Sequence, residues 1–402
     1  MNKKSIKNFI IHLWKNPLIG LAFLIIFAAI FVSISGANIR PDSSVDANNQ
    51  IPQIARQEPG TTISFLKLRK NKQVEEKNIF QKLFFGGEES KFSWVPFYDY
   101  EINDTHITLR EFTADSSSVN YTPSYITYDL YDVIENSSLK STSVVDGKGV
   151  KEAIAEKYIV TKVFYFGTDK HGRDLLSRLM AGTIVSLSIG FISVLISLCL
   201  GLFLGAVSGY FGGRIDDVIL WFINVVWSIP GLLLIISLTL ILGKGFMTIF
   251  IAVGLTMWVE LARVVRGQVI ALREMDYILA AKALGFSNFR IISKHIIPNV
   301  MDPVIVICAA NFGSAILIEA GLSFLGIGVQ IPTPSWGSII DQHKEYIIHA
   351  DKSFLALFPG VLIILLVFSF MIIGHHLREV FKLKSQANIW DENLKGAPVD
   401  HL

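Results

Sequence analysis

The sequence predicts an all-α polytopic membrane protein with about six transmembrane helices and an α+β domain inserted on the external side. Hydrophobic residues make up 51% of the 402 residues. The mean hydropathy of +0.48 is higher than soluble domains of this size usually reach. Apolar runs of about 18 residues or more recur along the chain. A polar stretch, residues 38–162, separates the first of these runs from the others.

Composition and motifs exclude several functions. The net charge is only +2, and membrane topology explains the basic residues better than a nucleic-acid surface does. Cys199 and Cys308 both lie in apolar runs, so no disulfide framework or cysteine-based metal site is indicated. The sequence contains no Gly-x-x-x-x-Gly-Lys-[Ser/Thr] loop, nucleophile elbow or His-Glu-x-x-His helix. We expect no active site, metal or cofactor on this chain.

The first apolar run, from Pro17 to about Ile34, follows a basic segment that contains Lys3, Lys4, Lys7 and Lys15. Positive residues before a first span predict a cytoplasmic N-terminus. A cleaved signal peptide is the alternative, because residues 33–36 resemble a cleavage site. We favour a retained helix, since the run is nearly long enough to span. Residues 1–36 then form the N-terminus and the first helix.

Residues 37–164 are expected to form the external α+β domain. Residues 100–112 alternate in polarity around an Asn103-Asp104 turn, which predicts a hairpin, and residues 124–134 are rich in Tyr, Ile and Val. A short helix is expected at about 150–158. The basic run Lys67–Lys72 could contact lipid headgroups or a partner, but a solvated surface is the simpler interpretation.

A motif follows at residues 166–178, FGTDKHGRDLLSR. Its glycines predict a turn, and the following residues predict an amphipathic helix that leads into the membrane. The candidate residues are Gly167, Thr168, Asp169, Gly172, Arg173 and Asp174. His171 between two aspartates could suggest a metal, but one histidine on a turn is a weak ligand set. We therefore predict no metal site here.

Five further spans are expected, at about 183–208, 218–242, 246–265, 304–325 and 354–373. Gly201, Gly205 and Gly209 predict close packing of the second span against another helix. Pro230 is expected to kink the third. Residues 330–353 form an external loop, and the basic segment His375–Lys384 places the tail, residues 379–402, in the cytoplasm.

Three polar residues within these spans, Asn224, Asn311 and Glu319, are candidates for lining a conduit. An ionisable group inside a span is costly and usually faces the bundle interior or a watery path. For Glu319 a structural role is an equally good interpretation.

A basic loop at residues 266–298 joins the fourth and fifth spans. Strong helix formers precede Gly285, which can end a helix with positive φ, and a second helix is expected to stop at Pro298. Short basic loops between spans belong on the cytoplasmic side. The candidate residues are Tyr277, Ala280, Ala281, Lys282, Gly285, Ile297 and Pro298. An ordinary interfacial amphipathic hairpin is the alternative.

Two of these motifs resemble a known family. Ala280-Ala281, Gly285 and Ile297-Pro298 have the spacing of the EAA loop in ABC-importer permeases, although Leu279 and His295 depart from the family pattern. Residues 166–178 resemble the signature that precedes the second span in the OppC/DppC-type peptide permeases. The segment 318–326, which includes Glu319, resembles a family signature of structural character. At Gly374-His375 the family usually has Gly-Asp.

The resemblance implies an ABC importer permease fold, with a core of five transmembrane helices at residues 165–378. It implies that the loop docks on ABC ATPase subunits, which would bind ATP and Mg, and that alternating access moves dipeptides or oligopeptides across the inner membrane. A second permease subunit and an extracytoplasmic solute-binding protein are the other expected partners. Both termini would be cytoplasmic. Nickel, another small solute or antimicrobial peptides stay open as substrates, and a secondary transporter or a membrane-anchored sensor stays open as a class.

Overall fold

The computed structural model describes residues 16–70, 78, 87–113, 123–133, 156–243 and 245–395, with only the backbone at 131–132 and 381–395. Several sequence predictions fall outside these residues, namely those on Lys3, Lys4, Lys7, Lys15, Asn71, Lys72 and most of the helix at 150–158.

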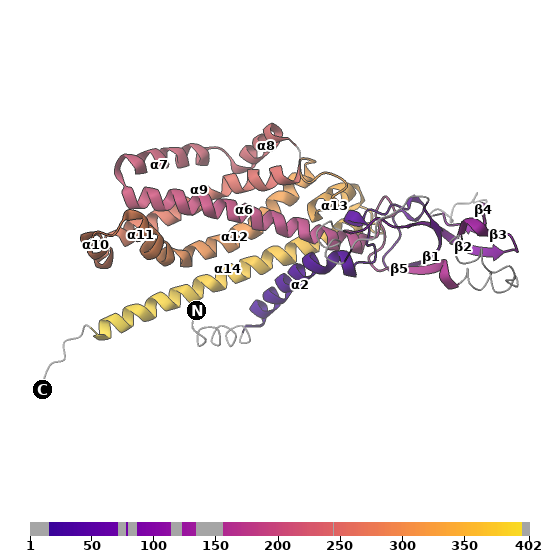
Figure 1. Ribbon diagram of the computed structural model, residues 1–402, viewed down its shortest axis with the longest axis horizontal. Coiled ribbons are helices and arrows are strands. Elements are labelled where there is room, and N and C mark those ends of the chain that lie inside the picture. Colours follow the sequence, from indigo (N-terminus) through magenta and orange to yellow (C-terminus); the bar gives the residue numbers. More distant parts are fainter. Residues whose placement is uncertain are drawn as a thin grey trace.

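A long helical bundle carries a β-sheet domain at one end and the short helices α10 and α11 at the opposite end (Figure 1). The bundle contains α2 (Pro17–Ile39), α6 (Leu175–Phe211), α9 (Phe246–Arg273), α12 (Ile297–Phe324) and α14 (Phe354–Lys395). Within the described ranges, 5 helices are long and apolar enough to cross a membrane, or up to 6 if one bent pair counts as a span. The predicted number of spans is confirmed.

Helices α6 and α9 form the centre of the bundle. A Cβ atom at Gly205 would lie 2.5 Å from the carbonyl oxygen of Ala262, and one at Gly209 would lie 2.8 Å from that of Arg266. Small residues in membrane helices permit such close backbone contact. The predicted packing role of these glycines is therefore confirmed, and α12, α14 and α2 pack around this pair.

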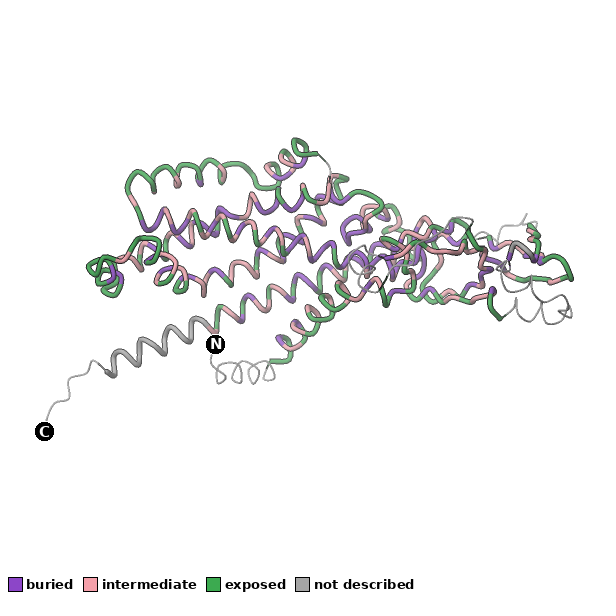
Figure 2. The backbone as a smooth tube through the Cα atoms, in the orientation of Figure 1, coloured by how far each residue is buried: buried purple, intermediate pink, exposed green. Residues whose placement is uncertain are grey.

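The third predicted span is not one kinked helix. It consists of α7 (Gly213–Ser228) and α8 (Gly231–Leu242), which meet at an angle of 90°. Proline cannot donate the backbone hydrogen bond that would continue α7, so the helix ends before Pro230 and a new one starts after it. Most of α7 is exposed (Figure 2), including Trp221 at 66%. In a membrane this surface contacts lipid or a neighbouring chain.

In the connection between α9 and α12, the short helices α10 (Asp276–Ala283) and α11 (Asn288–Ile291) flank Gly285. Its φ of +74° confirms the predicted glycine corner. The prediction that the second helix stops at Pro298 is wrong. A π-helical turn, η3 (Ile292–Ile296), leads directly into α12, and Pro298 lies in the first turn of α12. The π-helical turn just before Pro298 changes the hydrogen-bond pattern there, so the chain stays helical past a residue that cannot donate a backbone N–H.

The polar stretch between α2 and α6 contains a five-stranded antiparallel sheet, with strand order β4-β3-β2-β1-β5. The strands are β1 (Thr61–Arg69), β2 (Phe92–Ile102), β3 (His106–Glu111), β4 (Tyr125–Asp129) and β5 (Ile159–Phe164), and the short helix α4 (Leu130–Val133) follows β4. The predicted hairpin is confirmed as β2 and β3. Leu66 and Ile107 are buried on one face, and Ile63 and Phe65 pack with Ile54 in a second cluster.

Two segments with short helices lie where the sheet meets the bundle. One follows α2 and contains the short 3-10 helices η1 (Val45–Ala47) and η2 (Pro52–Ile54). The other follows α12 and contains α13 (Trp336–His343) and the 3-10 helix η4 (Lys344–Tyr346) before α14 begins. Trp336 is anchored to the bundle because its indole N–H donates to the carbonyl oxygen of Leu179 at 2.9 Å.

Candidate functional site

The motif at residues 166–178 forms a buried polar network where the sheet domain meets the bundle. Asp169 is completely buried and accepts the backbone N–H groups of His171 (2.8 Å) and Arg173 (2.9 Å). Its other carboxylate oxygen lies 2.6 Å from Nε of Arg173 and 3.8 Å from Nε of Arg178. One carboxylate thus compensates two guanidinium groups that are each 1% exposed.

Arg173 connects three segments of the chain. Its Nη1 donates to Oδ1 of Asn48 at 3.0 Å, and its Nη2 donates to Oε1 of Gln342 in α13 at 2.9 Å. Thr168 adds a further link, since its hydroxyl donates to the carbonyl oxygen of Ile54 and accepts the backbone N–H of Gln57. We call Thr168, Asp169, Gly172, Arg173 and Arg178 the external clamp. It fixes the segment after α2 and helix α13 to the start of α6.

Gly172 of the clamp has φ +70°, and a Cβ there would lie 1.8 Å from the carbonyl oxygen of Ile51. We expect Gly172→Ala to reduce the free energy of unfolding by at least about 2 kcal/mol more than Gly60→Ala does. Gly60 is a matched control because its φ is +84° and nothing lies within 4 Å of its Cβ position. Thermal unfolding of both variants in the same detergent measures the difference. Equal losses would exclude the Ile51 contact as the cause.

His343, next to the clamp, holds a neutral imidazole. Its Nδ1 donates to the carbonyl oxygen of Ile339 at 2.7 Å, and its Nε2 accepts the backbone N–H of Lys170 at 3.4 Å. Burial, with the positive charges of Lys170 and Arg173, lowers its pKa to about 4, against the opposing charge of Asp169 and the hydrogen bond to Ile339. Sequence analysis did not single out this residue, because a lone histidine carries no signal before its neighbours are known.

This histidine makes stability depend on pH. Because its pKa in the unfolded chain is 6.5 and folding lowers it to about 4, the unfolded state binds protons more readily between these values. The contribution is complete above about pH 6.5 and is lost as the pH falls toward about 4, on the order of 3 kcal/mol in total. Between these pH values, the unfolding temperature should therefore fall more steeply with decreasing pH for the wild type than for His343→Gln. If the unfolding temperatures of the two chains change with pH in parallel, the low pKa of His343 is contradicted.

Glu319 is a buried link between two helices. It is completely buried between α12 and the start of α13, where Oε1 accepts the hydroxyl groups of Ser323 and Ser335, each at 2.7 Å. Ser335 also caps α13 through the backbone N–H of Ser338. The geometry therefore supports the structural alternative for Glu319, because the side chain is fully enclosed and hydrogen-bonded to Ser335 at the start of α13.

We expect Glu319→Gln to retain both hydrogen bonds and to change the unfolding free energy by less than about 1 kcal/mol. Glu319→Ala removes the shared acceptor of two buried hydroxyl groups and leaves a void, so it should cost at least about 2 kcal/mol. Thermal unfolding of the two variants distinguishes these effects. If the glutamine variant is as unstable as the alanine variant, the hydrogen bonds to Oε1 are not what Glu319 contributes.

The other two candidates lie near a cavity of about 440 Å³ between α8, α9 and α12. Asn311, 6% exposed, lines it together with Glu260 and Pro230. Asn224 is not among the lining residues. It accepts a hydrogen bond from Nη2 of Arg263 at 2.8 Å, and that guanidinium lies 3.9 Å from the ring centre of Trp227. Asn224 therefore ties α7 to α9.

The loop between α9 and α12, residues 274–296, presents large apolar side chains at the end of the molecule opposite the sheet (Figure 1). We call it the α10–α11 loop. Leu284 is 73% exposed and Phe289 is 82% exposed, and Tyr277, Ala280, Lys282 and Gly285 are exposed as well. Large exposed apolar side chains of this kind indicate a contact with another protein or with the membrane surface. Sequence analysis missed Leu284 and Phe289, because helical periodicity does not reveal which apolar side chains lack a cover.

The inner face of this loop is packed against the bundle. Ile278, Ala281, Ile291 and Ile296 are buried in one cluster with Val265 and Val269 of α9 and Val300 of α12. Ala281, one of the candidate residues of the loop, is 5% exposed and holds the loop to its own helices. Pro298 is exposed and Ile297 half-buried, and Tyr210 of α6 donates to Oδ1 of Asn288 at 2.9 Å.

These features define a multi-pass membrane protein with a sheet domain clamped to one end of the bundle and an exposed apolar surface on the α10–α11 loop at the other end. A family model described as "Binding-protein-dependent transport system inner membrane component" matches residues 201–379. The oligopeptide transport system permease protein OppC of Bacillus subtilis (strain 168) is 36% identical over 224 residues, which is 56% of this chain and 73% of that protein. The dipeptide transport system permease protein DppC of Alkalihalophilus pseudofirmus is 41% identical over 223 residues, 55% of this chain and 73% of that protein.

The chain therefore belongs to the inner membrane components of binding-protein-dependent ABC importers, in the branch of the peptide permeases. Among solved structures, an inward-facing MetNI methionine ABC transporter is 20% identical with a TM-score of 0.39, over 50% of this chain and 96% of that one. The matched regions of the two permeases account for little more than half of this chain.

Proposed function

We propose that this permease moves short peptides inward across the membrane and that a separate ATPase subunit drives it through the α10–α11 loop. The single observation that carries the proposal is that the loop has an exposed apolar outer surface while its inner face is packed firmly against the helix bundle. Leu284 and Phe289 project from a loop whose inner face is fully packed. The names of the relatives support peptides as the transported class.

A displacement of the loop would be transmitted to the cavity in the bundle. The loop continues through η3 into α12 without a break, and α12 carries Asn311 on the cavity wall. Buried residues of α9 and α12 hold the loop, so it would move as one body with their ends. Interfaces packed in this way shift between discrete arrangements rather than deform gradually. The cavity would then open alternately to each side.

The membrane orientation follows from the same proposal. The α10–α11 loop would lie in the cytoplasm with the end of α14, and the sheet domain would lie outside, where a solute-binding protein delivers peptide. Helix α2 packs against α6 and α14 at the edge of the bundle. The exposed faces of α7 and α8, with Trp221 at 66% and Ile241 at 80%, are available to a second permease subunit. Both termini would then be cytoplasmic.

Uptake measurements test the substrate class. Cells that lack the gene should lose uptake of a radiolabelled dipeptide and regain it when the chain is restored. Excess unlabelled dipeptide should compete, whereas Ni²⁺ should not. Competition by nickel and not by peptides would overturn the peptide assignment and leave the ABC permease class intact. Loss of the peptide from preloaded cells in place of uptake would overturn the proposed direction.

A further inference from the structure

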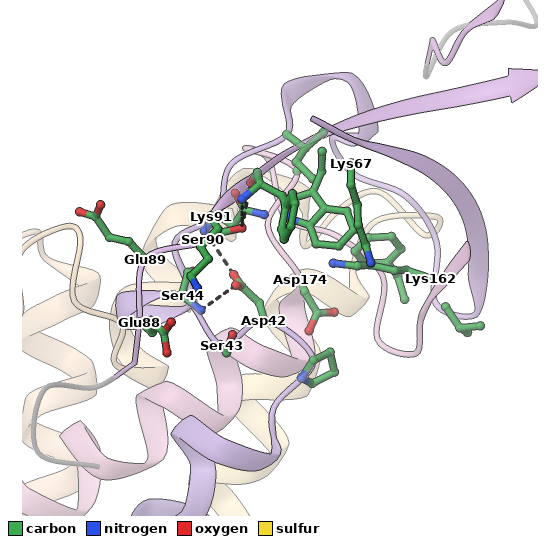
Figure 3. A pocket seen from close by; sticks show the side chains of 18 of the residues that line it. Asp42, Ser43, Ser44, Lys67, Glu88, Glu89, Ser90, Lys91, Lys162 and Asp174 are labelled. Carbon is green, nitrogen blue, oxygen red and sulfur yellow. Dashed lines mark hydrogen bonds between the residues drawn. The ribbon is translucent and has the colours of Figure 1, made fainter. Parts of the chain in front are cut away.

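A cavity of about 520 Å³ lies where the sheet domain meets the start of α6 (Figure 3). Its walls come from the segment after α2, from β1, β2 and β5, and from the turn before α6. Its volume is within the range of about 300–1,000 Å³ that is usual for sites of small molecules. No lining residue belongs to a membrane-spanning helix among the described residues, so the cavity opens on the external domain and not on the lipid.

One wall of this cavity is basic and aromatic. Nζ of Lys162 lies 3.4 Å from the ring centre of Trp94, and Nζ of Lys67 lies 5.6 Å from the same ring. Within the described part of the chain, neither ammonium group forms a salt bridge with a carboxylate. Burial and the charge of Lys67 lower the pKa of Lys162, although two acidic groups oppose this shift. Two neighbouring ammonium groups that form no salt bridge among the described residues favour the binding of an anion.

The facing wall is acidic. Asp42 and Asp174 both line the cavity, and Figure 3 shows Asp174 between Asp42 and Lys162. Burial raises the pKa of Asp174, and the charge of Asp42 raises it further, although hydrogen bonds from Ser177 oppose this. The backbone N–H groups of Ser44 and Asn49 hold Asp42 in place at 2.9 and 3.2 Å. Two neighbouring carboxylates favour the binding of an ammonium group.

Charges of opposite sign thus face each other across a space that their own side chains do not close. We propose that this cavity is a binding site for a short peptide with free termini, which places its carboxylate between Lys67 and Lys162 and its ammonium group toward Asp42 and Asp174. Trp94 and Phe92 offer apolar contact to a peptide side chain. The site lies outside the membrane, before the transport path begins. The choice of a peptide among zwitterions rests on the proposed function.

A phospholipid headgroup of the ethanolamine type carries the same two charges. It is the less suitable occupant, because its acyl chains need an apolar helix surface beside the headgroup and the cavity walls provide none among the described residues. A free peptide needs no such surface.

Isothermal titration of the purified full-length chain in lipid nanodiscs, with neither an ATPase nor a solute-binding protein present, tests the proposal. The probe is alanyl-phenylalanine with free termini, compared with its N-acetyl and C-amide forms. We expect each blocked form to bind at least about tenfold more weakly, because each loses one charge pair. Lys162→Gln and Lys67→Gln should weaken binding of the free dipeptide to a similar degree. Lys352→Gln, a partly exposed lysine outside the cavity, is the matched control and should leave binding unchanged.

The outcomes separate this proposal from the proposed function. Equal binding of free and blocked dipeptides, absence of binding, or equal binding of glycerophosphoethanolamine would overturn the peptide site, even if cells still take up peptide. If the chain binds the free dipeptide but not the blocked forms, and yet restores no peptide uptake, the site is supported and the proposal that peptides are the transported substrate is overturned. If one lysine variant does not fold, the other variant and the blocked dipeptides still decide the question.

Discussion

Replacement of Asp169 by asparagine is expected to lower the free energy of unfolding by about 3 to 5 kcal/mol. The substitution preserves the shape of the side chain but removes the one negative charge that touches Arg173 and Arg178, at 2.6 and 3.8 Å. Both guanidinium groups are 1% exposed and have no access to water. Breaking a buried ion pair from one side is costly because an uncompensated charge stays behind.

Thermal unfolding of the purified chain measures this loss, and limited proteolysis at the junction between the sheet domain and the bundle should become faster. Asp99→Asn is the matched control in the same domain. Its carboxylate pairs with Arg110 at 2.6 Å, but the Asp99 side chain is 73% exposed, so the control should cost less than about 1 kcal/mol. If the two variants lose the same stability, the clamp does not hold the domain as described.

Replacement of Phe289 by aspartate should reduce ATP-driven uptake at least about tenfold while the chain still folds. The side chain is 82% exposed, so a charge there meets water in the isolated subunit and costs little. In a docked complex the same charge would be buried against an apolar surface, which is strongly unfavourable. Phe289→Leu keeps the apolar character and should retain most of the uptake.

Uptake in reconstituted vesicles, together with thermal unfolding of each purified variant, separates loss of docking from loss of folding. Normal uptake by the aspartate variant would show that Phe289 lies outside the contact with the ATPase. Equal loss by the leucine variant would point to the shape of the aromatic ring and not to its apolar character.

The membrane spans could be predicted because long apolar runs have few alternative structures. The residues at which the helices begin and end could not be predicted from the sequence. Helix α6 begins at Leu175, so the predicted entry helix and the span predicted from about 183 form one helix, in which Ser177 and Arg178 are polar in sequence but buried in the fold. Local preference predicts that a helix ends at Pro298, yet η3 lets the helix continue. In both places tertiary contacts decided what local preference left open.

For the candidate sites too, the sequence indicated some of the residues, but only the fold showed which residues they contact. Asp169 and Arg173 stand out in the sequence as parts of a motif, and only the fold reveals that they form a buried network with Asn48 and Gln342, which lie far away in sequence. Glu319 is ambiguous in sequence, and its hydrogen bond with Ser335 decides its role. The external cavity could not be foreseen, because β1, β2 and β5 bring Lys67, Trp94 and Lys162 together across long stretches of chain.

Docking of an ATPase on the α10–α11 loop is the central claim, and purification of the intact chain from its native membrane in mild detergent tests it most directly. Gly285 has φ +74°, and nothing lies within 4 Å of its Cβ position, so Gly285→Asn tolerates the backbone conformation and Gly285→Glu adds a longer charged side chain to the exposed surface. We predict that an ATPase subunit co-purifies with the wild type and with Gly285→Asn, but not with Gly285→Glu. Absence of an ATPase from the wild-type preparation, or its equal recovery with all three chains, would contradict the claim.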